Sequence, residues 1–195
     1  MSRAIKDELA SHFVLMVCEG EAEEFVVLKL LEGDLLAVPR EHLVCDPMTG
    51  KPLTRLRRAR DIEQRFMNQD YTLDDNHELL VARILDRAGE RFDLRRAYRS
   101  TVMVRDFVTH PEIEMLAIHK LGAISDWRKA RDRQRGLKPS EFCRVNLGIA
   151  NVKHKAFLET FWETPEDLAQ TIRDCQPELR KTTRDELDLT DLLMA

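Results

Sequence analysis

The six residues FVLMVC at positions 13–18 form an unbroken apolar run near the start of the chain. A run this short, with no polar position, predicts a strand that is buried on both faces. The run ends at Glu19-Gly20, and apolar residues then recur at helical spacing from Phe25 until Gly33, where a helix is expected to stop. A strand, an acidic turn and a helix in this order predict the opening of an α/β unit.

Two further apolar runs resemble the first. LLVARIL at residues 79–85 ends at Asp86, and TVMVRDFV at residues 101–108 is followed by a helical pattern over residues 112–121. Pro111 suits the first position of that helix. Strands that alternate with helices imply right-handed crossovers and a mainly parallel sheet. We therefore expect an α/β fold with a mainly parallel sheet flanked by helices.

The second half of the chain changes character, because only helical patterns are found from residue 125 onward. Helices are predicted over residues 127–134, 139–147, 154–162 and 164–175. The end of the chain, LDLTDLL at residues 187–193, is expected to dock on the body of the protein or on a partner. We therefore expect an α/β domain over residues 1–122, and a helical extension with a C-terminal tail over residues 123–195.

The composition is that of a folded protein rather than a disordered chain, with 43% hydrophobic residues in 195. The net charge of −4 gives no overall electrostatic signature of a nucleic-acid binder. The four cysteines are widely spaced and form no CxxC pair, which argues against a zinc ribbon or a disulfide framework. A charged N-terminus without an apolar core and the absence of any membrane-length apolar run predict a cytoplasmic protein with no membrane partner.

Acidic residues follow all three predicted strands. Glu19 follows the first strand, Asp86 follows the second, and Glu112 with Glu114 opens the helix after the third. Functional groups collect beyond the carboxyl ends of the strands in a parallel sheet, and Mg²⁺ prefers oxygen ligands. The pattern predicts a metal site. The alternative is that these acids only stabilise helix N-termini through the helix dipole.

The same residues resemble the Toprim family, and in particular its RloB-like branch from prokaryotic defence loci. Glu19-Gly20-Glu21 after a strand resembles the first Toprim motif, and the strand that ends at Asp86 resembles the second. PEIEML at residues 111–116 resembles the Pro-x-x-Glu helix start of RloB-like proteins. Short bacterial proteins that share these motifs and KPSEFC, residues 138–143 here, are sometimes labelled adenine-specific DNA methylases.

The resemblance implies hydrolysis of phosphodiester bonds in DNA or tRNA, dependent on Mg²⁺ or Mn²⁺, in defence against phage. It makes Glu19 a metal ligand or general base, Asp86 a metal ligand and Glu114 a further ligand. The family usually has a second aspartate two residues after the first, where this chain has Ala88. Several other residues are auxiliary candidates for the site, namely Glu23, Glu90, Asp106, His110 and Glu112.

Basic residues cluster after Asp86 and could bind the phosphates of a nucleic acid beside the metal. The candidates are Arg87, Arg91, Arg95 and Arg96. A second cluster spans residues 128–138. Each cluster can also be read as a solvated, locally balanced surface.

The alternative function is a non-catalytic Toprim-like regulatory or binding subunit of a defence complex, which Ala88 and the negative net charge favour. A toxin that acts on tRNA would share the nuclease mechanism. A methyltransferase is excluded, because the chain has neither a glycine-rich cofactor loop after the first strand nor an Asn/Asp-Pro-Pro-aromatic motif. The expected partners are nucleic acid and an ATPase or other defence-system protein, and the oligomeric state stays open.

Overall fold

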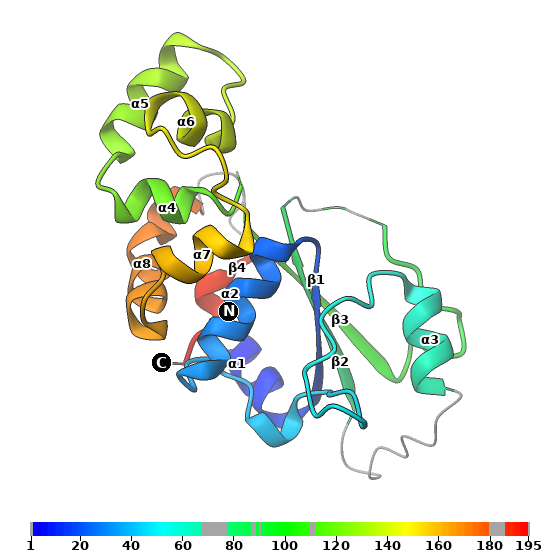
Figure 1. The fold of residues 1–195 in the computed structure, drawn as a ribbon. Coiled ribbons are helices and arrows are strands. Elements are labelled where there is room, and N and C mark those ends of the chain that lie inside the picture. Colours follow the sequence, from blue (N-terminus) through cyan, green and yellow to red (C-terminus); the bar gives the residue numbers. More distant parts are fainter. Residues whose placement is uncertain are drawn as a thin grey trace.

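The computed structural model describes residues 2–67, 78–86, 89, 91–109, 112–179 and 186–194. Within them, four parallel strands form one sheet in the order β1-β2-β3-β4 (Figure 1). The strands are β1 (Phe13–Cys18), β2 (Leu79–Leu85), β3 (Val102–Val108) and β4 (Leu187–Asp188). The predicted α/β class, with a parallel sheet flanked by helices, is confirmed.

Helices surround this sheet and form most of the second half of the described chain. They are α1 (Ser2–Ser11), α2 (Glu21–Glu32), the short 3-10 helix η1 (Arg40–His42), α3 (Ala59–Met67), α4 (Met115–Lys120), α5 (Ile124–Arg133), α6 (Pro139–Asn146), α7 (Lys155–Phe161), α8 (Pro165–Leu179) and α9 (Leu189–Leu192). No helix among the described residues combines the length and apolar character needed to cross a membrane.

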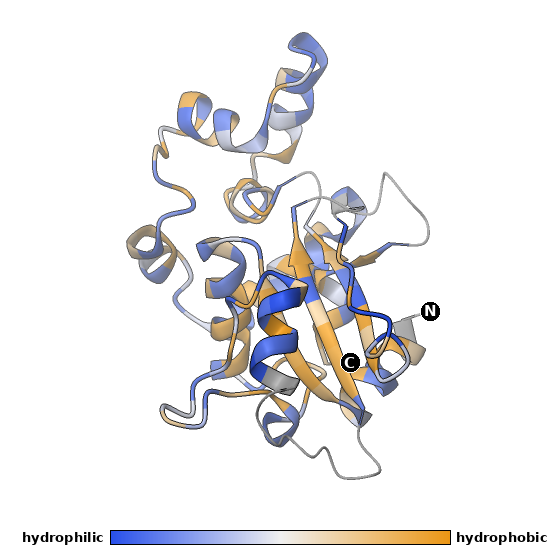
Figure 2. Ribbon diagram, turned by 90° about the vertical axis from the view of Figure 1, so that its right-hand side faces the viewer, coloured by the Kyte–Doolittle hydropathy of each residue, from blue (hydrophilic) through white to orange (hydrophobic). Residues whose placement is uncertain are grey.

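Side chains alternate between two hydrophobic clusters along the strands. Val14, Met16 and Cys18 of β1 belong to the larger cluster, which also includes residues of α1, α2 and α8. Leu15 and Val17 belong to the smaller cluster, which includes Ile62 of α3. Figure 1 shows α3 on one face of the sheet and α1, α2 and α8 on the other, and Figure 2 shows the apolar character of the strands between them. β1 and β2 are therefore buried on both faces, whereas the four central residues of β3 are only partly buried.

The C-terminal segment completes the sheet and the larger cluster. Phe107 and Val108 of β3 pair with Leu187 and Asp188 of β4, and the backbone N–H of Ala37 donates to the carbonyl of Leu192 at 2.8 Å. Three leucines after β4, Leu189, Leu192 and Leu193, are buried in the larger cluster. The prediction that the end of the chain docks on the body is confirmed. Residues 123–195 thus share a hydrophobic core with residues 1–122.

One predicted helix starts later than expected. The pattern over residues 112–121 predicted a helix from the start of that range, but α4 begins at Met115 and residues 113–114 form a turn. Pro111, predicted at the first helical position, lies outside the described residues. The side chain of Glu112 instead makes a tertiary contact, accepting a hydrogen bond from the backbone N–H of Ser140 at 3.1 Å. This contact connects the segment before α4 to the start of α6.

Candidate functional site

The first two strands deliver two of the predicted acids to one edge of the sheet. Cys18 and Ile84 are paired in parallel register, and the backbone N–H of Glu19 donates to the carbonyl of Ile84 at 3.1 Å. The Glu19 Oε2 atom accepts a hydrogen bond from the backbone N–H of Asp86 at 2.8 Å. Glu19 and Asp86, 67 residues apart in the sequence, are therefore in direct contact.

The end of the third strand orients the Asp86 carboxylate. The Thr109 backbone N–H donates to the carbonyl of Leu85 at 2.8 Å, and the buried Thr109 hydroxyl lies 3.1 Å from Asp86 Oδ1. The same hydroxyl lies 3.3 Å from the carbonyl oxygen of Leu85, so it has two acceptors for its one proton, and neither is the other oxygen of Asp86. That oxygen, Oδ2, lies 3.6 Å from the Lys153 ammonium.

The same lysine contacts Glu114, which precedes α4. Lys153 Nζ lies 3.1 Å from Glu114 Oε1, and the Glu114 side chain is 1% exposed. Neither Glu114 oxygen has a well-aligned hydrogen bond to another described residue, so the lysine charge is close but poorly directed. Burial raises the pKa of the Glu114 carboxyl, and the Lys153 charge opposes that rise. Lys153 therefore connects the second strand end to the segment after the third strand.

A fourth acid, Glu23, completes this group from the first turn of α2. Glu23 is 3% exposed. Burial raises its pKa to about 7, with a further contribution from the Asp86 and Glu19 charges and an opposing one from Lys153. A Cβ atom on Gly20 would lie 2.6 Å from Glu23 Oε2, so any larger residue at this turn would displace the Glu23 carboxyl group. We call Glu19, Glu23, Asp86, Glu114 and Lys153 the acidic cluster.

The structure does not bring every predicted site residue to the acidic cluster. Asp106 belongs to the smaller-cluster face of β3, where its carboxylate lies 3.4 Å from the buried Arg83 side chain. Arg83 in turn lies 4.7 Å above the Phe92 ring. Glu112 binds the start of α6, as described above. Glu90 and His110 lie outside the described residues, as does Ala88.

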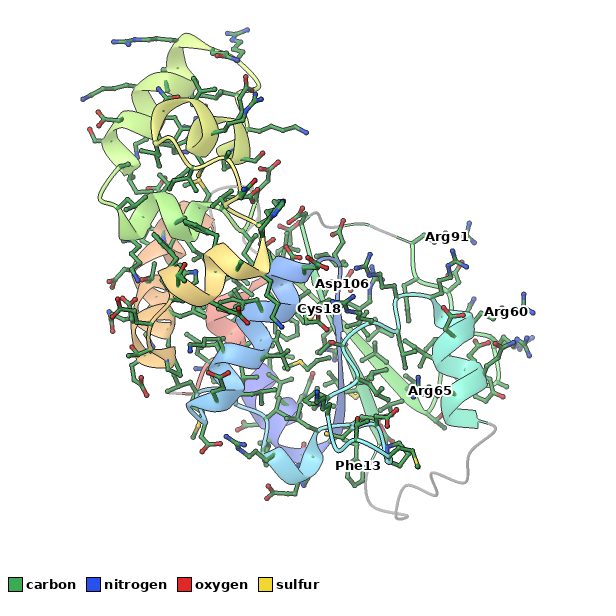
Figure 3. The ribbon with its side chains drawn as sticks, in the orientation of Figure 1. Phe13, Cys18, Arg60, Arg65, Arg91 and Asp106 are labelled. Carbon is green, nitrogen blue, oxygen red and sulfur yellow. The ribbon has the colours of Figure 1, made fainter. Side chains whose placement is uncertain are left out.

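Two of the arginines that follow Asp86 in the sequence, Arg91 and Arg95, turn away from the acidic cluster. Arg91 pairs with Asp93, and Arg95 contacts Glu63 of α3 at 3.1 Å. Leu94 between them packs in the smaller hydrophobic cluster, which carries this segment over the α3 face. Figure 3 shows Arg91 at the outer edge of the molecule, away from Cys18. Arg96 is exposed in the same segment, and Arg87 lies outside the described residues.

Sequence reasoning missed Lys153. It lies in the stretch NVKHK before α7, where nothing distinguishes it from any other surface lysine. Burial works against its charge, but the Glu114 and Asp86 carboxylates outweigh burial and raise the pKa of Lys153. The lysine is therefore a fixed cation within the acidic cluster.

A groove of about 340 Å³ opens beside Lys153 and Glu114 and leads toward α6. Its wall includes Ser140 and Arg144 of α6 and Asn151 of the following loop. The groove thus reaches the acidic cluster at Glu114 and Lys153, from the side of α6.

No protein-family model, curated protein or solved structure matches this chain in the comparisons. The resemblance to the Toprim family accordingly remains an interpretation of the motifs.

The acidic cluster offers the donor chemistry of a hard cation but not a finished coordination shell. All four acids provide oxygen atoms, the ligands that Mg²⁺ prefers, and Glu114 is buried without an aligned hydrogen-bond partner among the described residues. Within the same residues, however, no three His, Cys, Asp or Glu side chains are grouped tightly enough to hold one metal ion. A divalent cation at this place would have to displace the Lys153 ammonium from between Asp86 and Glu114.

Proposed function

We propose that this chain hydrolyses phosphodiester bonds of a nucleic acid in a reaction dependent on Mg²⁺ or Mn²⁺. The observation that carries the proposal is that the Asp86 and Glu114 carboxylates converge on the Lys153 ammonium at the carboxyl edge of a parallel sheet. Glu19 accepts the Asp86 backbone N–H beside them, and the charges of Asp86 and Glu19 act on Glu23. Like charges this close favour a cation or protons between them. The motif resemblance to Toprim and RloB-like proteins adds a role in phage defence, with an ATPase or other defence protein as partner.

In this proposal, the residues of the acidic cluster have different roles. Asp86 and Glu114 would hold the ion, and Thr109 keeps Asp86 oriented through its hydroxyl group. Mg²⁺ held there would polarise a phosphoryl oxygen and lower the pKa of an attacking water. Glu19, which is exposed and accepts the Asp86 backbone N–H, would take up the proton of that water or serve as a further ligand.

The substitution Glu19→Gln tests the proposal. Glutamine keeps the acceptor oxygen for the Asp86 N–H but cannot take up a proton or carry the charge, so we expect cleavage to fall by roughly 100-fold or more. Cleavage of single-stranded DNA, duplex DNA and tRNA is measured with Mg²⁺, Mn²⁺ or EDTA. Glu21→Gln, which removes a nearby exposed acid, is the matched control and should retain activity.

A second candidate is a non-catalytic binding or regulatory subunit. Lys153 favours it, because a tethered ammonium already neutralises part of the charge that a metal would neutralise, and so does Ala88 in place of the second family aspartate. Titration calorimetry with Mg²⁺ and Mn²⁺ separates the two functions. If the wild type neither binds these ions nor cleaves any substrate, the nuclease proposal fails and the subunit stands.

A further inference from the structure

Positive charge is concentrated in residues 124–146, which we call the α5–α6 arm. The arm contains seven Lys and Arg residues and three Asp and Glu residues, a net charge of +4 in a chain whose total is −4. The rest of the chain therefore carries −8. In Figure 1 the arm projects from the body beyond α4. A polyanion would be repelled by most of this protein and attracted to the arm.

Most of the positive charges on the arm are not used in ion pairs. Arg128 pairs with Glu178, and Lys129 lies 3.2 Å from Asp126. Among the described residues, no ion pair involves the other five, and all five are exposed: Arg131, Arg133, Arg135, Lys138 and Arg144. Figure 3 shows nitrogen-tipped side chains that extend from α5 into solvent. These cations are available to an external anion.

The arm is a packed unit rather than a loose extension. Trp127 of α5 is 2% exposed and meets the Phe142 ring edge-on, at 5.5 Å between centroids. Cys143 is also buried in the same hydrophobic cluster. Because the aromatic residues form this core, the arm presents cations and no stacking platform for bases. This composition suits contacts to a phosphate backbone, which fix position without reading sequence.

A hydrogen bond and a groove connect the arm to the acidic cluster. Glu112, two residues before Glu114, accepts a hydrogen bond from the backbone N–H of Ser140 at the start of α6. Arg144 of the arm lines the groove of about 340 Å³ whose wall also includes Glu114 and Lys153. A chain of phosphates bound along the arm would enter this groove from the Arg144 side and reach Lys153.

We propose that the α5–α6 arm binds the phosphate backbone of a nucleic acid and guides it through this groove to the acidic cluster. This inference rests on the proposed function, because hydrolysis at the acidic cluster is the reason for bringing the backbone there. It replaces the arginines after Asp86 as the nucleic-acid surface, since Arg91 and Arg95 pair with acids on the α3 face. The charge of +4 on the arm favours a polyanion, and under the proposed function that polyanion is a nucleic acid rather than an acidic protein or an anionic membrane.

The test compares two triple variants in a Glu19→Gln background, which prevents cleavage. Arg131→Ala/Arg133→Ala/Arg135→Ala removes arm cations, and Arg91→Ala/Arg95→Ala/Arg96→Ala removes as many cations from the α3 face. Binding of labelled 30-nucleotide DNA and RNA, single-stranded and duplex, is measured by fluorescence anisotropy in EDTA at several salt concentrations. We expect the Kd of the arm variant to be at least about 10-fold higher at 100 mM salt. The slope of log Kd against log salt concentration should fall by about two. The control should change the Kd less than twofold.

The outcomes separate this inference from the proposed function. Binding that depends on the arm, with no metal-dependent cleavage by the chain with Glu19 intact, supports the arm and contradicts the nuclease. Cleavage by a chain whose arm variant binds normally supports the nuclease and overturns the arm. Equal weakening by both triple variants, or binding to phosphatidylserine vesicles but to no nucleic acid, also overturns the arm. Circular dichroism confirms that each variant is folded.

Discussion

Replacing Lys153 with methionine is expected to lower the free energy of unfolding by about 2–3 kcal/mol at pH 8, because it leaves the buried Glu114 carboxylate without its cation. The Lys153 side chain itself is 42% exposed, which keeps the loss at the low end for a buried charge. Glu114 is 1% exposed and its carboxylate lies 3.1 Å from Lys153 Nζ. Methionine keeps most of the length and apolar contacts of the lysine stem. The loss therefore reports the charge, and urea unfolding followed by circular dichroism measures it.

The size of this loss should depend on pH and on divalent cations. Once Lys153 is gone, Glu114 and Glu23 can take up protons instead of remaining charged and buried, so we expect a smaller loss at pH 5 than at pH 8. If the acidic cluster accepts a divalent cation, millimolar Mg²⁺ should restore stability to Lys153→Met more than it stabilises the wild type, because ligands that bind only the folded state stabilise it.

Lys155→Met provides the matched control. Lys155 is 73% exposed and lies 3.6 Å from Glu159 one helical turn away, and such exposed pairs contribute about 0.5 kcal/mol or less. A loss after Lys153→Met no larger than that of the control would show that Lys153 is an ordinary surface lysine. A full loss without Mg²⁺ rescue would show a structural ion pair and argue against a metal at the acidic cluster.

The strands could be predicted because burial on both faces leaves few polar residues in them. The runs that contain β1, β2 and β3 end within a residue of the predicted positions. The contact of Glu19 with Asp86 was also within reach, since neighbouring parallel strands end at the same edge. Two local signals were available but not used. Ile5 and Leu9 of α1 are both buried one turn apart, and Glu23 shares a helix face with the buried Val27 and Leu30.

The remaining features depend on contacts that no local pattern encodes. Lys153 reaches Asp86 from 67 residues further along the chain, through a loop that follows α6. The arginines after Asp86 were predicted beside the metal because they are adjacent in sequence. The packing of Leu94 and the Arg95 contact to Glu63 carry Arg91 and Arg95 to the α3 face instead. Proximity along the chain after a strand end is therefore weak evidence of proximity in space.

Glu23→Gln is expected to make the protein more stable than the wild type at pH 8 and nearly equal to it at pH 5. Burial raises the pKa of Glu23 to about 7, from an ordinary value of 4.5. Between these two values the folded state holds a proton that the unfolded state has released. The contribution of Glu23 is therefore fully present below about pH 4.5 and is lost as pH rises toward 7. A rise of this size corresponds to about 3 kcal/mol, and Glu114, whose pKa burial also raises, acts in the same direction.

Glutamine mimics the protonated carboxyl group at every pH, so the variant should lack the part of the stability loss that comes from Glu23. Urea unfolding in EDTA at pH 5, 6, 7 and 8 measures the slope of the free energy of unfolding against pH for each protein. Glu24→Gln is the control with the opposite sign. Its carboxylate binds Arg55 and the Thr54 hydroxyl, and its pKa is lowered, first by the hydrogen bond to Arg55. The free energy of unfolding of Glu24→Gln should be about 1 kcal/mol lower than that of the wild type at pH 8, whereas that of Glu23→Gln should be higher.

Parallel slopes for wild type and Glu23→Gln would mean that Glu23 is ionised in the folded protein throughout this range, and the expected protonation of Glu23 in the folded state would be wrong. Repeating the pH series with Mg²⁺ tests whether the ion binds at the acidic cluster. A cation held by the acidic cluster competes with protons for the same oxygens, so it should stabilise the wild type more at pH 8 than at pH 5. Stabilisation by Mg²⁺ that is the same at both pH values would place the ion elsewhere on the protein.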